Sequence, residues 1–300
     1  MMLPYCRMLC SDVDVEYFVD NILRIDPNEK REAINSITSA ERNMQGYDWV
    51  QTSTYKDYRD FEYRDEKIRE QLRASIVNEL IVQKRLDDDN AITLGNGGAA
   101  PKTQLKAEKK MFYVIGPPAA GKSGISNKIA DAIGGYILDS DYAKRKLPEY
   151  KNQIAGASLV HDESDQLIFS YNKGNLLEHC IEKNYNIVIP KIGYLLKKVE
   201  DFCGIMKKIG YSVFLISVDI DRAKATQRAY NRFKESGRYV PLSAIFDAYA
   251  NEPTLTYFRL KQMDSDGIFD GFAQISTDVF PPTLKEQVNL EMLVDLFKEV

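Results

Sequence analysis

The chain has 300 residues, enough for two domains, and its 44% hydrophobic and 28% charged residues are ordinary for a soluble globular protein. Residues 1–108 carry 15 Lys and Arg against 20 Asp and Glu, and the rest carries 25 against 24, so neither part has the basic character of a general nucleic-acid binder. Because no apolar run is long enough to span a membrane and the first ten residues lack the apolar stretch of a signal peptide, we expect a cytoplasmic protein without a membrane partner.

Residues 1–90 have the pattern of a helical domain. Apolar residues suggest helices at 13–25 and 28–44, and the strongest helical periodicity runs from 55 to 85. The aromatic residues at the start of that third segment either pack inside a helical bundle or contact a partner or a substrate base. Gly, Ala and Pro at 91–107 are typical of a linker or an ordered loop.

Residues 108–300 alternate short apolar runs with helical patterns. We expect strands at 111–115, 135–138, 186–189, 212–218 and 272–276, and helices at 123–133, 164–183, 195–209, 221–235, 241–250 and 284–298. Such alternation predicts an α/β fold with a parallel sheet and helices on both faces, preceded by the smaller helical domain. Ligands of such sheets bind at the carboxyl ends of the strands.

One loop between the first strand and the first helix of this region fits the phosphate-binding pattern G-x-x-x-x-G-K-[ST]. Its backbone N–H groups and the N-terminus of the following helix would point at phosphates. Lys122 would reach the β- and γ-phosphates of ATP or GTP, and the Ser123 hydroxyl would bind Mg²⁺. The predicted nucleotide-binding residues are Gly116, Pro117, Pro118, Ala119, Ala120, Gly121, Lys122, Ser123 and Gly124.

Two carboxylates follow the second expected strand, so they lie at the same sheet edge as the loop. Asp139 and Asp141 are two apart, and in an extended segment they would share a face. One could support Mg²⁺ while the other accepts a proton from an attacking hydroxyl.

Three arginines suggest a lid over the phosphates. Arg228 and Arg232 are four residues apart on one face of the expected 221–235 helix. Gly237 would break that helix and let Arg238 fold back toward Arg232. Guanidinium groups in this arrangement could offset the charge on a phosphoryl group in transfer.

These blocks, in this order, resemble the zeta toxin kinases. The resemblance covers about residues 108–250 and includes the phosphate-binding loop, the run Leu138 to Lys144 with Pro148-Glu149-Tyr150, and the run Gly237-Arg238-Tyr239-Val240-Pro241. It implies a P-loop kinase-type fold for residues 108–300, in which Lys122 and Ser123 bind ATP and Mg²⁺. Of the two carboxylates after the second strand, Asp139 is our candidate for a further metal ligand. The resemblance also implies that Asp141 is the general base and that Arg232 and Arg238 are the catalytic lid arginines.

The family resemblance further implies an acceptor and a partner. Family members phosphorylate a sugar hydroxyl of UDP-N-acetylglucosamine, and many are toxins restrained by an antitoxin, which can be fused at the N-terminus. The family often has Glu-Gly-Thr after the third strand, whereas this chain has Pro190-Lys191-Ile192-Gly193. The candidate substrate contacts are Glu163, Lys191 and Arg228, and the acceptor is a related sugar nucleotide or another small molecule.

Three hypotheses follow for function. The first is an ATP- and Mg²⁺-dependent kinase acting on a small-molecule hydroxyl. The second is a P-loop kinase acting on a nucleotide or a nucleic-acid end. The third is a nucleotide-gated interaction module, which would need Lys122 but no proton acceptor at Asp141. For residues 1–90 we expect one of two roles. They act either as a regulatory cis-inhibitor that blocks the phosphate site or as a structural support.

Overall fold

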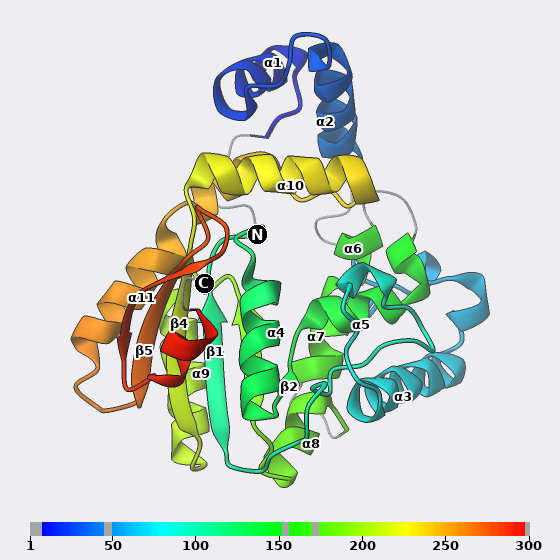
Figure 1. The fold of residues 1–300 in the computed structure, drawn as a ribbon. Coiled ribbons are helices and arrows are strands. Elements are labelled where there is room, and N and C mark those ends of the chain that lie inside the picture. Colours follow the sequence, from blue (N-terminus) through cyan, green and yellow to red (C-terminus); the bar gives the residue numbers. More distant parts are fainter. Residues whose placement is uncertain (1–7, 45–49, 152–155, 170–173, 298–300) are drawn as a thin grey trace.

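The computed structural model describes residues 8–44, 50–151, 156–169 and 174–297. A six-stranded sheet runs through the larger part of the molecule in the order β2-β3-β1-β4-β5-β6 (Figure 1). The strands are β1 (Lys110–Ile115), β2 (Tyr136–Ile137), β3 (Ile187–Lys191), β4 (Ser212–Asp219), β5 (Gly271–Ser276) and β6 (Thr283–Val288). β1 to β5 are parallel, and β6 is antiparallel to β5.

Helices cover both faces of the sheet because the central strands are apolar on both sides. On one face, α4 (Lys122–Ile133) packs against β1, β2 and β3 and contacts α12 (Met292–Leu296). On the other face lie α9 (Leu196–Lys208) and α11 (Glu252–Met263), which contact each other and β4. Phe112 and Phe214 stack on neighbouring strands, while Tyr113 points to the opposite face and packs on Phe202 of α9. The predicted α/β class, with a parallel sheet covered on both faces, is confirmed.

The N-terminal part is helical, as expected. α1 (Asp12–Phe18) continues into a π-helical turn, η1 (Val19–Leu23), and packs against α2 (Lys30–Met44). These helices stand above α10 (Arg222–Ser236) in Figure 1. The third helix, α3 (Glu66–Val82), lies apart from them, against α5 (Ser140–Lys146), α7 (His161–Phe169) and α8 (Leu176–Glu182).

The remaining elements are short. They are the 3-10 turns η2 (Lys56–Tyr58), η3 (Phe61–Tyr63), η4 (Asp89–Ala91) and η5 (Pro148–Lys151), the one-turn helix α6 (Gly156–Leu159) and the π-helical η6 (Ala244–Tyr249). Within the segment 91–107, Ile92, Ala99 and Ala100 are buried, and the backbone N–H of Ile137 donates to Ala99 O at 3.0 Å. Across the described ranges, no helix is both long and apolar enough to cross a bilayer.

Three expected helices differ from those found. The 55–85 segment becomes helical only at Glu66, because the Asp65 side chain accepts from the backbone N–H groups of Lys67 and Ile68 and so caps the helix start. The expected helix 164–183 is two helices: α8 has its own cap at Asn175, whose side chain accepts from Glu178 N. The expected helix 284–298 was wrong over its first third, 284–288, which belongs to strand β6 along the edge of β5.

A buried arginine joins α3 to the sheet region. Arg69 is fully buried and its guanidinium contacts two buried carboxylates, with Nη1 2.8 Å from Glu149 Oε1 and Nη2 2.6 Å from Glu163 Oε2. Thr52 Oγ1 also donates to Glu163 at 2.6 Å. Burial favours the neutral form of Glu163, but Arg69 outweighs it and lowers the pKa from 4.5 to about 2.

Removing one partner from such a network leaves buried charges without compensation. We expect Arg69→Met to lower the free energy of unfolding by about 3–5 kcal/mol at pH 7, measured by urea denaturation. Arg31→Met, at an exposed position of α2, should leave the free energy unchanged. Because the folded-state pKa of Glu163 is depressed, its contribution is complete above pH 4.5 and is lost as the pH falls toward about 2. The difference between wild type and Arg69→Met should therefore shrink over that range, and a difference independent of pH would contradict the charge-based account.

Candidate functional site

The loop between β1 and α4 lies at the carboxyl end of a central strand. Its backbone enters the left-handed region at Ala119, with φ of 61°, and at Gly121, with φ of 81°. Gly116 has no room for a side chain, since a Cβ there would lie 2.5 Å from Val218 O. Helix α4 begins directly after the loop, at Lys122, so its free N–H groups border the loop. This geometry is that of a phosphate-binding loop.

Lys122 is folded back onto its own loop. Its Nζ donates to Gly116 O and to Pro117 O, at 2.8 Å each. Burial, together with the nearby charge of Arg232, lowers the pKa of Lys122 to about 8, although Asp139 and Asp141 favour the charged form. An ammonium group that is bound by backbone carbonyls, and not paired with a carboxylate, is well suited to an anionic ligand.

Asp139 and Asp141 lie at the start of α5, not in the extended segment that we expected. Asp139 is the N-cap, and its Oδ1 accepts from Asp141 N at 2.9 Å. Burial and the neighbouring Asp141 raise the pKa of Asp139 to about 6. Burial also favours protonation of Asp141, but the charges of Lys144, Arg238 and Arg145 outweigh it and hold its pKa well below the ordinary value. The helix start thus places one carboxylate that protonates easily beside another that stays ionised.

The lid arginines reach the same place from α10. Gly237 ends that helix with φ of 69°, and Arg238 then turns inward so that its Nη2 lies 2.6 Å from Asp141 Oδ2. Arg228 donates to Thr277 O at 2.7 Å. The Nε atoms of Arg232 and Arg238 are buried and have no hydrogen-bond partner. Two buried donors without acceptors point to a missing anion.

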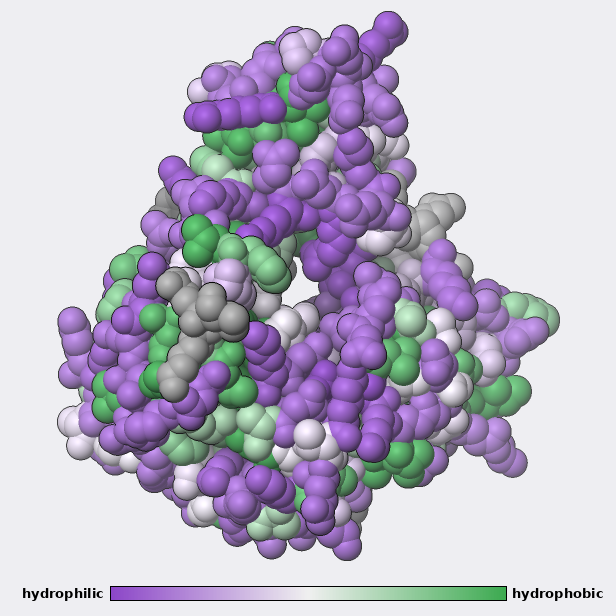
Figure 2. All heavy atoms as spheres, in the orientation of Figure 1, coloured by the Kyte–Doolittle hydropathy of each residue, from purple (hydrophilic) through white to green (hydrophobic). Residues whose placement is uncertain are grey.

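These groups line one cleft of about 540 Å³. Figure 2 shows the surface hollowed below α10, with mostly hydrophilic walls. The cleft brings together most of the residues singled out in the sequence. They are Pro118, Ala119, Ala120, Gly121, Lys122, Ser123, Asp139, Asp141, Lys191, Arg228, Arg232 and Arg238.

Four of the sequence candidates lie elsewhere. Gly116 and Pro117 shape the loop and bind Lys122 through their carbonyls, and Gly124 is exposed in the first turn of α4. Glu163 is buried under the cleft wall with both oxygens on Arg69, and Arg73 Nε donates to it as well, at 2.8 Å. The prediction of Glu163 as a substrate contact is therefore wrong, because its carboxylate is buried and bound by arginines.

Three polar residues of the cleft were not among the predicted site residues: Ser140, Lys144 and Asp165. Lys144 lies 3.0 Å from Asp141, three residues earlier on α5, and could have been found had that segment been recognised as a helix. Asp165 accepts from Ser140 Oγ at 2.7 Å and from Lys191 Nζ at 2.8 Å. The contact between Lys191 and Asp165 joins residues that are 26 positions apart, and no local pattern indicates it.

A second cleft, of about 700 Å³, adjoins the first and shares Asp165 and Lys191 with it. The Lys191 ammonium lies 4.0 Å above the Phe169 ring, which packs edge-on against Phe202. Aromatic and aliphatic side chains from β1, β3, α7, α8 and α9 line most of this space, and Glu178, Glu182, Lys198 and Asp201 add charge. The Lys191–Asp165 pair therefore stands between a polar cleft and a more apolar one.

The donor set fits a nucleoside triphosphate with Mg²⁺. The curled loop and the start of α4 supply N–H groups for phosphates, and the orphaned Nε atoms of Arg232 and Arg238 supply two further donors. Ser123 and Asp139 offer a hydroxyl and a carboxylate on the same cleft, which are oxygen ligands of the kind that Mg²⁺ takes alongside phosphates.

Comparisons with known proteins agree with this geometry. The sequence model of the zeta toxin family matches residues 98–269, more than half of the chain. Among solved structures, the chain is similar to one from a study of the PezAT chromosomal toxin–antitoxin system of the human pathogen Streptococcus pneumoniae, with 13% identity and a TM-score of 0.54. That match covers 80% of this chain and 90% of the other, and at this identity it shows the fold alone.

Two structures of an AvrRxo1-ORF1:AvrRxo1-ORF2 complex are also similar, at 17% identity. The native form has a TM-score of 0.43 and covers 79% of this chain and 73% of that one. The form with ATP has a TM-score of 0.46 and covers 78% and 72%. No curated protein sequence matches the chain.

The family match covers the loop with Lys122, the carboxylates that follow β2 and the arginines of the lid, which are the groups that the cleft brings together. The chain belongs to the zeta toxin family.

Proposed function

We propose that the protein transfers the γ-phosphoryl group of ATP, with Mg²⁺, to a hydroxyl of a small molecule. The observation that carries the proposal is the position of Asp141, an ionised carboxylate in the same cleft as the phosphate-binding loop and two arginines. Positioning and charge balance account for most of the catalysis of phosphoryl transfer, and this cleft has groups for both.

On the donor side, the loop and α4 bind the phosphates and Lys122 moves from its backbone carbonyls to the β- and γ-phosphate oxygens. Ser123 and Asp139 would hold Mg²⁺, which supplies neutralising charge at those oxygens when it is bound. Arg232 and Arg238 donate to the γ-phosphoryl group, which satisfies the Nε atoms that lack partners.

On the acceptor side, Asp141 orients the hydroxyl and takes its proton as the new O–P bond forms. When Arg238 turns to the phosphate, one cation leaves Asp141 while its burial remains, so the pKa of the carboxylate rises and it becomes a better proton acceptor. A loose transition state needs little deprotonation at the start, which suits a base of low pKa.

The second cleft is our proposed site for the rest of the acceptor. It adjoins the cleft that contains Asp141, and between them lies Lys191, at the position where the family often has Glu-Gly-Thr. UDP-N-acetylglucosamine is the acceptor that the family suggests, and an antitoxin is the partner that it suggests. Labelled ATP with this sugar nucleotide, and then with a metabolite extract, followed by mass identification of the product, would identify the acceptor.

Two substitutions separate a kinase from a nucleotide-gated interaction module. Lys122→Ala should weaken ATP binding at least about tenfold, because it removes a charged donor to the phosphates. Asp141→Asn should bind ATP normally but lower kcat for acceptor phosphorylation by roughly 10²–10⁴-fold, because it removes the proton acceptor. Binding is measured by calorimetry and turnover by release of labelled product.

Asp266→Asn, at an exposed position far along the chain, serves as the matched control and should change neither value. Full transfer by Asp141→Asn would refute the assignment of the base. Tight ATP binding by wild type with no product from any metabolite fraction would favour the interaction module. A product only on nucleotides or nucleic-acid ends would favour the second kind of kinase.

Lys191 should act on the acceptor and not on ATP. Lys191→Met removes an ammonium from the boundary of the two clefts, so we expect KM for the acceptor to rise about tenfold or more while KM for ATP stays within about twofold. Lys197→Met, at an exposed position on α9, is the control. Equal changes in the two KM values would show that Lys191 belongs to the nucleotide site.

A further inference from the structure

The residue after the lid arginine is attached to the N-terminal helices. Tyr239 is 3% exposed, and its hydroxyl donates to Glu41 Oε1 at 2.5 Å. Glu41 is equally buried and lies on α2, 198 positions earlier in the chain. A phenol that donates to a buried carboxylate makes one of the stronger hydrogen bonds in proteins.

Tyr239 is also held from its other side. Its ring packs edge-on against Phe233 of α10, with ring centroids 4.9 Å apart. Burial and the neighbouring Glu41 raise the pKa of Tyr239 well above its ordinary value, so the phenol remains a donor. The side chain therefore forms a fixed bridge between α2 and the end of α10.

The turn at Gly237, just before this bridge, has open space beside it. Gly237 has a left-handed backbone, and no atom outside its own neighbourhood lies within 4 Å of the position a Cβ would take. Arg238 sits between this open turn and the anchored Tyr239. The anchor therefore constrains the Arg238 backbone from its C-terminal side, while the Gly237 N–H, which donates to Phe233 O at 2.9 Å, constrains it from the other side.

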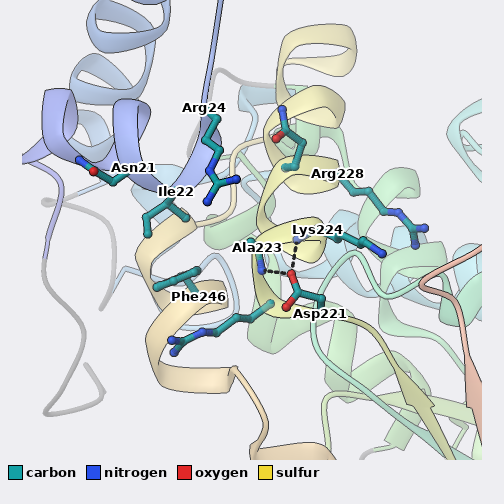
Figure 3. Close-up of a pocket in the computed structure, with 10 residues that line it drawn as sticks. Asn21, Ile22, Arg24, Asp221, Ala223, Lys224, Arg228 and Phe246 are labelled. Carbon is teal, nitrogen blue, oxygen red and sulfur yellow. Dashed lines mark hydrogen bonds between the residues drawn. The ribbon is translucent and has the colours of Figure 1, made fainter.

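Other contacts place the N-terminal helices against the same lid, by which we mean α10 and the segment that follows it as far as η6. Phe18 of α1 packs edge-on against Phe246 of η6, and Lys234 of α10 pairs with Glu29 at 2.7 Å on the surface. Asn21, Ile22 and Arg24 line, together with the first turns of α10, a groove of about 750 Å³ (Figure 3). This groove lies at the start of α10, whereas the buried hydrogen bond between Tyr239 and Glu41 lies just beyond the opposite end of the helix, next to Arg238.

We propose that the α1–η1–α2 unit supports the lid, and that Glu41 and Tyr239 are positioning residues for Arg238 in phosphoryl transfer. This inference rests on the proposed function. None of the described residues that line the phosphate cleft comes from the N-terminal 90 residues, so these helices lie behind the lid. They also lie outside residues 98–269, the region that the family shares. We propose support of the lid in place of inhibition by blocking the cleft.

The test is a double-mutant cycle with conservative partners. Tyr239→Phe keeps the ring and removes the donor, and Glu41→Leu removes the acceptor. We expect each to lower kcat by roughly 5- to 100-fold with KM for ATP within about twofold, and the double variant to lose no more than either single one. Glu41→Gln keeps an oxygen that accepts from the phenol and should recover most of kcat. Arg42→Met, at the next position of α2, is the control and should match wild type.

A second measurement separates this inference from the proposed function. Hydrogen exchange of residues 233–242 in the full chain should quicken in Tyr239→Phe and Glu41→Leu but not in Glu41→Gln, whether or not an acceptor is known. Wild type without phosphoryl transfer would refute the proposed function, while unchanged exchange in both variants would refute the support of the lid. Quickened exchange with a wild-type kcat would also overturn the inference, because the bridge would then not position Arg238 for transfer.

Discussion

The ion pair between Arg238 and Asp141, 2.6 Å across, connects the two parts of the cleft that must work together. One partner comes from the lid and the other from the start of α5, and either charge would be costly in this partly enclosed place without the other. A triphosphate would offer Arg238 a stronger anionic partner. Under the proposed function, the lid would exchange a carboxylate for a phosphoryl group with little change in the number of buried charge contacts.

The sheet makes this pair possible. Because β1 to β5 are parallel, the phosphate loop, the α5 start, Lys191 and Thr277 all follow strand ends at one edge. Thr277 ties that edge to the lid: its hydroxyl donates to Ala120 O at 2.8 Å, and its carbonyl accepts from Arg228. These two contacts therefore hold α10 beside the phosphate loop, although the N-terminal helices hold the other end of α10.

Much of this could be predicted from the sequence, because the loop, the carboxylates after β2 and the helix with its arginines are short-range patterns with fixed spacing. The sequence could not show that Glu163 pairs with Arg69 or that Tyr239 meets Glu41, since such contacts depend on the packing of distant segments. It also gave the wrong element at 284–288, where a helical pattern was overruled by the open edge of β5. Local propensity is weak where backbone groups of a strand need partners.

The same difference between short-range patterns and long-range packing separates the phosphate-donor side of the site from the acceptor side. Phosphate recognition uses backbone N–H groups and a few cations, so one motif is enough to define it. The proposed acceptor site is lined by side chains from β1, β3, α7, α8 and α9, whose identities carry no shared spacing. Among the residues that the structure describes, Asp165, Glu178, Glu182 and Asp201 line the second cleft, and Lys191 and Lys198 are its basic residues. These described charges favour an acceptor whose anionic part lies toward Lys191 and the lid arginines, with a neutral part among the aromatic rings.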